Sequence, residues 1–139
     1  MEILYYYKGD SRKAVSNFDV RWLSADDYDT FCEHLTLCGQ RSIDEAKWKR
    51  AYADGTVYCG LFADGKMLAR ACVEKYSVNA WEVADVRTVR QFQNNGYAFQ
   101  LCSFVLNYIL ENGRTATIRT EEDNVRMKKV VEKLGFSLL

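Results

Sequence analysis

Apolar and polar residues alternate along several short segments of the chain, which is the pattern of half-buried β-strands. The first such segment is rich in tyrosine and is expected at the edge of a sheet. Predicted strands cover Ile3 to Tyr7, Phe18 to Leu23, Thr56 to Ala63, Lys66 to Lys75, Val78 to Val89 and Thr115 to Thr120, with a stub from Phe136 to Leu139.

Two of these strands are separated only by Asp64-Gly65, and an Asp-Gly pair between apolar runs is a strong signal for a β-hairpin. A two-residue turn of type I′ pairs Ala63 with Lys66. In that register the side chains of Cys59 and Cys72 are expected on the same face of the hairpin, as diagonal neighbours.

Four other segments carry apolar residues at helical spacing, and residues that favour helix ends flank them. Ser24 with Asp27, and Ser42 with Glu45, have the spacing of capping boxes and predict two helix starts. Asp123 is expected to cap the last helix. The predicted helices run from Ser24 to Gly39, from Ser42 to about Tyr52, from about Tyr97 to Asn112, and from Asn124 to Gly135.

The order of these elements predicts an α+β fold, in which an antiparallel meander is followed by one βαβ unit. The chain has 139 residues, which fits a single domain over residues 1–139. Hydrophobic residues make up 48% of it, enough to bury a core without disulfides or metals.

Charge and cysteine content exclude several classes of protein. The formal net charge is zero, which counts against a nucleic-acid-binding protein. The five cysteines form no CxxC pair, so we expect free thiols in a reducing compartment, no metal site, and a cytoplasmic protein. His34 and Cys38 are spaced so that both could touch a metal, but two ligands alone are insufficient. The N-terminus does not resemble a signal peptide, and no apolar run has membrane-spanning length.

The segment most informative about chemistry runs from Val86 to Ala98, where a strand passes through a tight loop directly into a helix. The first amides of a helix have no intrahelical partners and lie at the positive end of its dipole. Such a terminus binds anions such as pyrophosphate. Gly96 lets a ligand approach the backbone, and Ala98 keeps the next position small.

Residues Gln93 to Ala98, read as Gln-Asn-Asn-Gly-Tyr-Ala, resemble the pyrophosphate-arm motif of the GNAT (GCN5-related N-acetyltransferase) superfamily. The preceding Val86-Arg87-Thr88 and Phe92 are similar to that family's approach strand and loop. Asn124 to Phe136, which ends Lys-Leu-Gly-Phe, resembles its second motif. The resemblance is detailed from about Thr56 to Phe136.

The resemblance implies a GNAT-like, mostly antiparallel central sheet with helices on both faces, splayed apart where acetyl-CoA binds. It implies transfer of an acetyl group from acetyl-CoA to an amine by direct attack in a ternary complex. The cofactor would lie between the strand ending near Val89 and the strand starting near Thr115. The cofactor-binding residues it assigns are Val86, Arg87, Thr88, Gln93, Asn94, Asn95, Gly96, Tyr97, Ala98 and Asn124.

Two acidic residues are candidates for the base that deprotonates the amine. Glu82 is the first choice, because its spacing before the motif glutamine matches a catalytic glutamate of some GNAT enzymes. Asp85 is the second choice, and its alternative interpretation is an ion-pair partner of Arg87 or Arg70.

The sequence departs from the family pattern in two places. Val131 stands where many GNAT enzymes carry a tyrosine that protonates the leaving thiolate. Residues 136–139 are also too short for the terminal strands that usually complete the fold. Either the chain is trimmed, or a partner subunit supplies the missing edge, so a homodimer is one arrangement that the sequence leaves open.

Two departures of this kind keep a second function open: a domain that binds acyl-CoA as a sensor or regulator without catalysis. A protein-interaction domain that binds no CoA is a third alternative. The expected partner of an active enzyme is a small-molecule or peptide amine, with no nucleic acid and no membrane. No motif identifies the amine.

Overall fold

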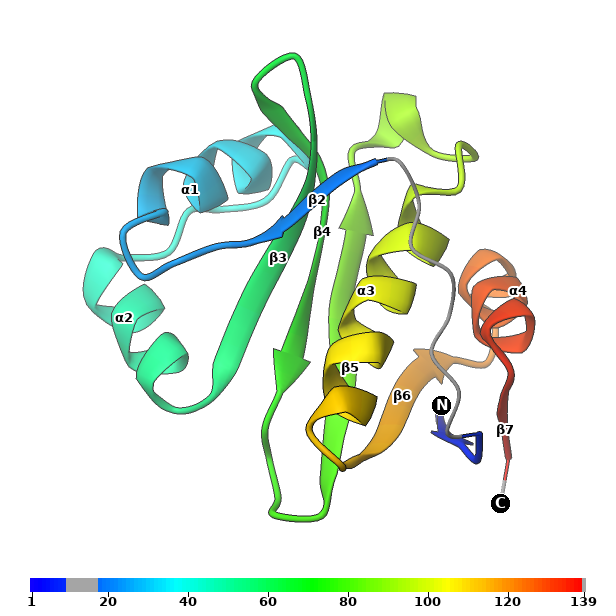
Figure 1. Cartoon of the computed structure of the whole chain (residues 1–139). Helices are drawn as coiled ribbons and strands as arrows, with labels where there is room; N and C mark the ends of the chain where they lie inside the picture. The colour runs from blue at the N-terminus through cyan, green and yellow to red at the C-terminus, as the bar shows by residue number, and fades with distance from the viewer. Residues whose placement is uncertain (10–17, 139) are drawn as a thin grey trace.

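A computed structural model describes residues 1–9 and 18–138. Within this part of the chain, seven strands form one sheet in the order β2-β3-β4-β5-β6-β1-β7 (Figure 1). The strands are β1 (Glu2–Tyr7), β2 (Asp19–Trp22), β3 (Thr56–Ala63), β4 (Lys66–Glu74), β5 (Ala80–Thr88), β6 (Thr115–Glu121) and β7 (Phe136–Ser137). The helices are α1 (Tyr28–Leu37), α2 (Glu45–Ala53), α3 (Tyr97–Glu111) and α4 (Val125–Leu134), with a short 3-10 helix η1 (Arg90–Phe92).

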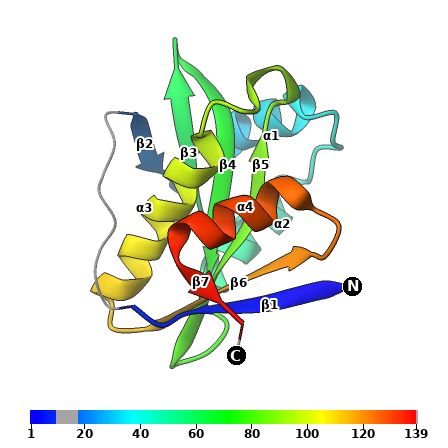
Figure 2. The same cartoon turned by 90° about the vertical axis from the view of Figure 1, so that its right-hand side faces the viewer.

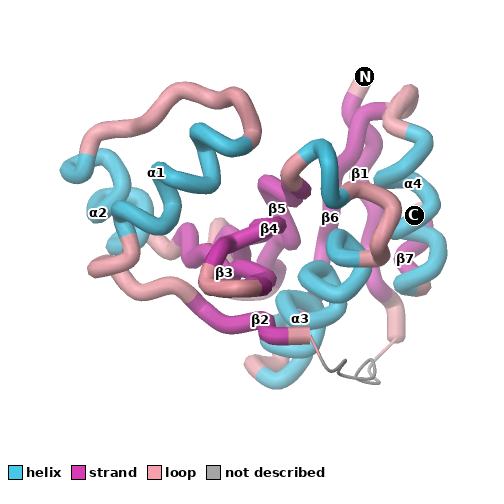
Figure 3. The backbone as a smooth tube through the Cα atoms, turned by 90° about the horizontal axis from the view of Figure 1, so that it is seen from above, coloured by secondary structure: helices cyan, strands magenta, loops and turns pink. Residues whose placement is uncertain are grey.

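Helices cover both faces of the sheet, as the family resemblance implied (Figures 2 and 3). α3 packs on β4 and β5, and α4 lies beside it over β6 and β7. These helices close the larger core, in which Leu106 and Val131 are fully buried. On the opposite face, α1 and α2 pack on β3 and β4 around Phe31 and Trp48, whose rings lie 4.5 Å apart. The sheet is therefore the middle layer of three.

The hairpin turn has the predicted conformation, but the register of the two strands beyond it differs from the prediction. Asp64 and Gly65 have φ of 52° and 78°, as a type I′ turn requires. A bulge at Leu61 and Phe62 then shifts the pairing of β3 with β4 by one residue. Cys59 consequently lies opposite Ala71, and Cys72 lies opposite Tyr58. The prediction that the two cysteines share a face was wrong, because a one-residue shift exchanges the faces of a strand.

The βαβ prediction is confirmed by β5, α3 and β6, since β5 and β6 are parallel neighbours. Their pairing begins at Ala80 and Thr115 and ends at Val83 and Ile118. β5 nevertheless continues to Thr88 and β6 to Glu121, so the strands part beyond this point (Figure 1). A second irregularity lies in β5 itself, where the register with β4 shifts and Asp85 has a φ of 45°. This bulge bends β5 just beyond its last residues that pair with β6.

β1 is not the edge strand that the sequence suggested. It pairs antiparallel with β6 on one side, as Tyr5 does with Ile118, and with β7 on the other, as Tyr6 does with Ser137. Alternation of side chains predicts a strand but not its neighbours, which depend on the topology. The N-terminal strand thus covers the edge of β6, so the short C-terminal stub does not require a second subunit there. Leu139, the end of the predicted stub, lies outside the described residues.

Helix boundaries agree with the predictions except for the capping residues. α1 begins after Asp27 rather than Ser24, and the Asp27 carboxylate accepts a hydrogen bond from the Ser24 amide at 2.6 Å. α2 is capped by Asp44 instead of Ser42. α4 is capped by Asn124 instead of Asp123. Serine, aspartate and asparagine are about equally good caps, so sequence alone does not choose between adjacent ones.

Candidate active site

The loop between β5 and α3 leads into the first turn of α3, whose amides have no intrahelical partners. Val89 still hydrogen-bonds to the carbonyl of Leu68 before the chain enters η1. Asn94 and Gly96 then adopt left-handed conformations, with φ of 69° and 79°. Gly96 is the N-cap of α3, and no side chain in the described part of the structure caps it. The first amides of a 15-residue helix therefore remain available for an anion.

Side chains fix the shape of this loop. The Asn95 side-chain amide donates to the carbonyl of Phe92 at 2.9 Å, and that of Gln93 donates to the carbonyl of Thr88 at 3.4 Å. Arg126, from α4, donates to the side-chain oxygen of Gln93. Sequence reasoning missed Arg126, because it follows Gln93 by 33 residues and only the fold brings them together. Arg126 places a positive charge beside the loop, whereas the side chain of Gln93 is neutral.

The other predicted cofactor residues lie at the end of β5 and at the starts of α3 and α4. Val86 and Thr88 are half-buried and Arg87 is exposed, all toward the end of β5. Tyr97 and Ala98 form the first turn of α3. Asn124 is exposed at the start of α4, where its side-chain oxygen accepts a hydrogen bond from the Met127 amide at 3.1 Å.

Glu82 lies next to the last paired residues of β5 and β6, opposite Thr117 on β6 and Glu74 on β4. Its side chain is almost completely buried, with 6% of the residue exposed. The Thr117 hydroxyl donates to Oε1 at 3.2 Å, and Nη1 of Arg119 lies 3.3 Å from the same oxygen. Burial raises the pKa of the Glu82 carboxyl above its ordinary value, although Arg119 and Thr117 oppose this shift. Glu82 is therefore a partly desolvated carboxylate at the point where the strands separate.

Asp85 belongs to a different network from Glu82. Its carboxylate accepts hydrogen bonds from Nε and Nη2 of Arg70, each at 3.2 Å, and from the Tyr58 hydroxyl at 2.7 Å. The ion pair with Arg70 is one of the two that the sequence suggested. Burial raises the pKa of Tyr58, so this phenol remains protonated and keeps donating to Asp85.

Val131 and the nearby tyrosines offer no acid in the place where the family pattern has one. Val131 is fully buried in the core beneath α3. Tyr97 packs edge-on against Phe18, with ring centroids 5.4 Å apart. Tyr108 packs against Trp22 and Trp81. Both tyrosines therefore take part in packing.

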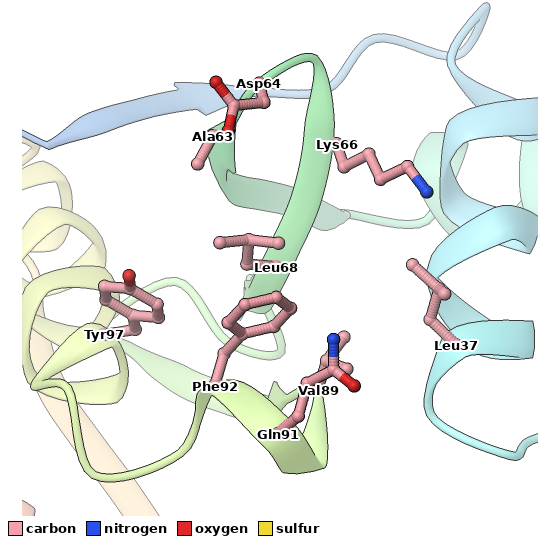
Figure 4. A pocket seen from close by; sticks show the side chains of 9 residues that line it. All are labelled: Leu37, Ala63, Asp64, Lys66, Leu68, Val89, Gln91, Phe92 and Tyr97. Carbon is pink, nitrogen blue, oxygen red and sulfur yellow. The ribbon is translucent and has the colours of Figure 1, made fainter.

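A cavity of about 420 Å³ lies beside the loop (Figure 4). The tip of the β3–β4 hairpin, the end of α1, η1 and the first residue of α3 surround it. Leu68, Val89 and Phe92 provide apolar walls, and the long side chain of Lys66 extends along one side. Its lining includes Tyr97, so the cavity adjoins the loop that presents the free amides.

His34 and Cys38 form no metal site with other residues. In the described part of the chain, no three histidine, cysteine, aspartate or glutamate side chains come close enough to hold a metal ion. Nδ1 of His34 instead accepts a hydrogen bond from Arg70 at 3.1 Å. Burial and this arginine lower the pKa of His34 to about 4, so the imidazole is neutral at pH 7. All five cysteines are free thiols, and three of them are buried.

None of the helices in residues 1–9 and 18–138 is both long and apolar enough to cross a membrane.

Comparison with protein families finds a match to the acetyltransferase (GNAT) family over residues 19–136. A search among curated proteins finds no match. A GNAT-family protein from Novosphingobium aromaticivorans has a similar structure, with 19% identity and a TM-score of 0.78. The match covers 99% of this chain and 59% of that one, so this chain spans less than two thirds of that protein's length.

Two solved structures of similar length to this chain also match. AAC(6')-Iy, solved with the bisubstrate analogue CoA-S-monomethyl-acetylneamine, has 20% identity and a TM-score of 0.71, covering 88% of this chain and 92% of its own. The ribosomal-protein-S18-alanine N-acetyltransferase from Escherichia coli has 16% identity and a TM-score of 0.71, covering 86% and 77%. At these identities the likeness establishes a shared fold.

Proposed function

The chain belongs to the GNAT acetyltransferase family, and from that premise we propose that it moves an acetyl group from acetyl-CoA to a primary amine of a small molecule or peptide. One observation carries the proposal: β5 and β6 part just beyond Glu82, between a buried carboxylate and a loop of free amides. A thioester placed in that gap would have an anion site on one side and a base on the other.

The residues around the point where β5 and β6 part suit acetyl-CoA. The amides of Gln93 to Ala98 would hold the pyrophosphate, and Arg126 would add a charge-assisted contact. Val86, Arg87 and Thr88 would line the pantetheine arm, which can add hydrogen bonds to a strand that has lost its neighbour. Asn124 lies at the start of the next helix and is proposed to face that arm. When bound, acetyl-CoA supplies an activated acyl group.

Glu82 is the residue that we propose as the general base. A neutral amine is needed for attack on the thioester carbonyl, and ionised Glu82 accepts the proton that the amine gives up. As the nitrogen–carbon bond forms, the carbon–sulfur bond breaks and CoA leaves as a thiolate. A backbone amide of β5 would stabilise the charge on the carbonyl oxygen. The raised pKa of Glu82 makes it a stronger base than an exposed glutamate.

The leaving group does not require the missing tyrosine. An alkyl thiol has a pKa of about 8.5, so its thiolate leaves readily and can take a proton from water. Asp85 is the weaker candidate for the base, because both of its oxygens already accept hydrogen bonds from Arg70. We also propose that the 139 residues act as one domain in the cytoplasm, where five free thiols remain reduced.

Thermal unfolding with and without acetyl-CoA tests the binding half of this proposal. A ligand at about a hundred times its dissociation constant adds roughly 2.7 kcal/mol to the free energy of unfolding, which gives a clear rise in the melting temperature. ATP at the same concentration controls for nonspecific binding of a polyphosphate. An unchanged melting temperature at millimolar acetyl-CoA would contradict the proposal. A rise without any turnover would favour a CoA-binding sensor.

A further inference from the structure

We propose that Thr117 and Tyr76 form a proton relay that connects Glu82 to solvent. The inference rests on the proposed function, because it takes Glu82 to be the base. It adds two residues that the family resemblance does not assign, one on β6 and one just after β4.

The three groups form a continuous chain of hydrogen bonds from the core to the surface. The Thr117 hydroxyl lies 3.2 Å from Oε1 of Glu82, and the Tyr76 hydroxyl lies 3.1 Å from the Thr117 hydroxyl. Glu82 is 6% exposed and Thr117 is 1% exposed, whereas Tyr76 is 51% exposed. The chain therefore begins at the buried carboxylate and ends at a phenol in contact with water.

A buried base needs such a route because it must lose its proton after every turnover. The charged groups facing Glu82 are Arg119 on β6, Glu74 on β4 and Glu2 on β1. Arg119 is a permanent donor and cannot accept a proton. The two carboxylates act on Glu82 through their charge, and in residues 1–9 and 18–138 neither of them hydrogen-bonds to it. Thr117 is the neighbour that can both donate and accept.

The relay works by reversing the direction of its hydrogen bonds. With Glu82 ionised, Tyr76 donates to Thr117 and Thr117 donates to Glu82. When the amine has given its proton to Glu82, the carboxyl donates to Thr117, Thr117 to Tyr76, and Tyr76 releases one proton to water. One proton enters at Glu82 and one leaves at Tyr76, so the relay itself is unchanged. The carbonyl of Trp81, 3.5 Å from the Thr117 hydroxyl, gives that hydroxyl a second acceptor while it turns.

Thr117→Val tests the relay, because it removes the hydroxyl and keeps the branched shape of the side chain. We expect kcat to fall about tenfold or more, within the range of proton-transfer effects, while KM for acetyl-CoA changes less than twofold. Added imidazole should restore part of the lost rate by carrying the proton directly. Tyr76→Phe should lower kcat in the same direction but less, since water can replace an exposed phenol.

Thr120→Val is the matched control, because Thr120 is a buried threonine three residues along the same strand. If its kcat falls as much as that of Thr117→Val, or if kcat of Thr117→Val stays within twofold of wild type, the relay is wrong. A purely structural hydrogen bond would affect stability but would give no rescue by imidazole.

A second measurement separates failure of the relay from failure of the proposed function. Carbon-13 NMR follows the Glu82 carboxyl during a pH titration, with no substrate present. Thr117→Val removes a donor that favours the carboxylate, so it should raise the pKa of Glu82. An unchanged pKa would show that the Thr117 hydroxyl does not hydrogen-bond to the Glu82 carboxylate, and it would overturn the relay. If Thr117→Val raises the pKa of Glu82 but the wild-type protein acetylates no amine, the proposed function is overturned instead.

Discussion

Arg70 and Asp85 form an ion pair that holds β4 to the bulge of β5, with Nε 3.2 Å from Oδ2. Arg70 is 1% exposed, whereas the Asp85 side chain is 36% exposed. The same guanidinium donates to Gln40 at 2.9 Å and to His34 at 3.1 Å, so it also holds α1 and the loop after it. Asp85 keeps a left-handed backbone within a strand, a strained conformation that surrounding contacts must maintain.

Asp85→Asn should lower the free energy of unfolding by about 3 kcal/mol, because the Arg70 guanidinium would stay buried without its counter-charge. Asparagine also tolerates positive φ, so the change removes the charge and spares the backbone. Asp64→Asn is the control, since Asp64 is exposed and has a similar φ of 52°. Urea denaturation compares the two variants. Equal, small effects would show that the ion pair does not stabilise the bulge.

Gly96→Ala should weaken acetyl-CoA binding, and Gly113→Ala should not. Both glycines have positive φ, 79° and 69°, and an added Cβ would meet no atom within 4 Å at either position. Each substitution should therefore cost about 1 kcal/mol of stability through backbone strain. Gly96 also lies in the loop proposed to hold the pyrophosphate, whereas Gly113 ends α3. Calorimetric titration checks this; equal affinities in the two variants would exclude the loop as the binding site.

Arg126→Gln should raise the dissociation constant of acetyl-CoA by up to about fivefold at low salt, because an exposed charge contact contributes up to about 1 kcal/mol. The difference from wild type should shrink at high salt, where exposed charges are screened. Lys129→Gln removes a charge from an exposed position on the same helix and should leave the affinity unchanged. If both variants bind alike, Arg126 does not contact the cofactor.

Glu82→Gln should stabilise the protein at neutral pH. The folded protein holds a proton on Glu82 more tightly than the unfolded chain does, because burial raises this pKa. Stability from this group is therefore complete below the unfolded pKa, about 4.3, and is lost as pH rises through the folded pKa. The gain in the variant should disappear near pH 4. Glu132→Gln, at an exposed position, is the control, and a gain that does not depend on pH would contradict the assigned shift.

The sequence predicted those features that depend on neighbouring residues. Asp64-Gly65 requires a type I′ turn, and the strand-loop-helix pattern before Gly96 exposes amides wherever it occurs. The bulge at Leu61 and Phe62 was not predictable, because no residue pattern in the two strands marks where their register shifts. It reversed the expected faces of the two hairpin cysteines.

The sequence also could not predict which distant residues the topology brings together. Arg126 has no motif that pairs it with Gln93. Thr117 is an ordinary threonine until the pairing of β6 with β5 places it beside Glu82, and Tyr76, after β4, then contacts Thr117. The position of β1 between β6 and β7 depends on which strand has a free edge, and alternation of side chains carries no information on that.

Transfer of a labelled acetyl group tests the account most directly. Trideuteroacetyl-CoA is incubated at pH 7 with a panel of amines and peptides, and mass spectrometry detects the labelled product. A thiol dye would be less specific, since Cys32 and Cys38 are only half-buried. The account predicts labelled product with at least one amine, and a rate at least about a hundredfold lower in Glu82→Gln. The account would be contradicted if no amine gave labelled product at saturating acetyl-CoA, or if Glu82→Gln kept full activity.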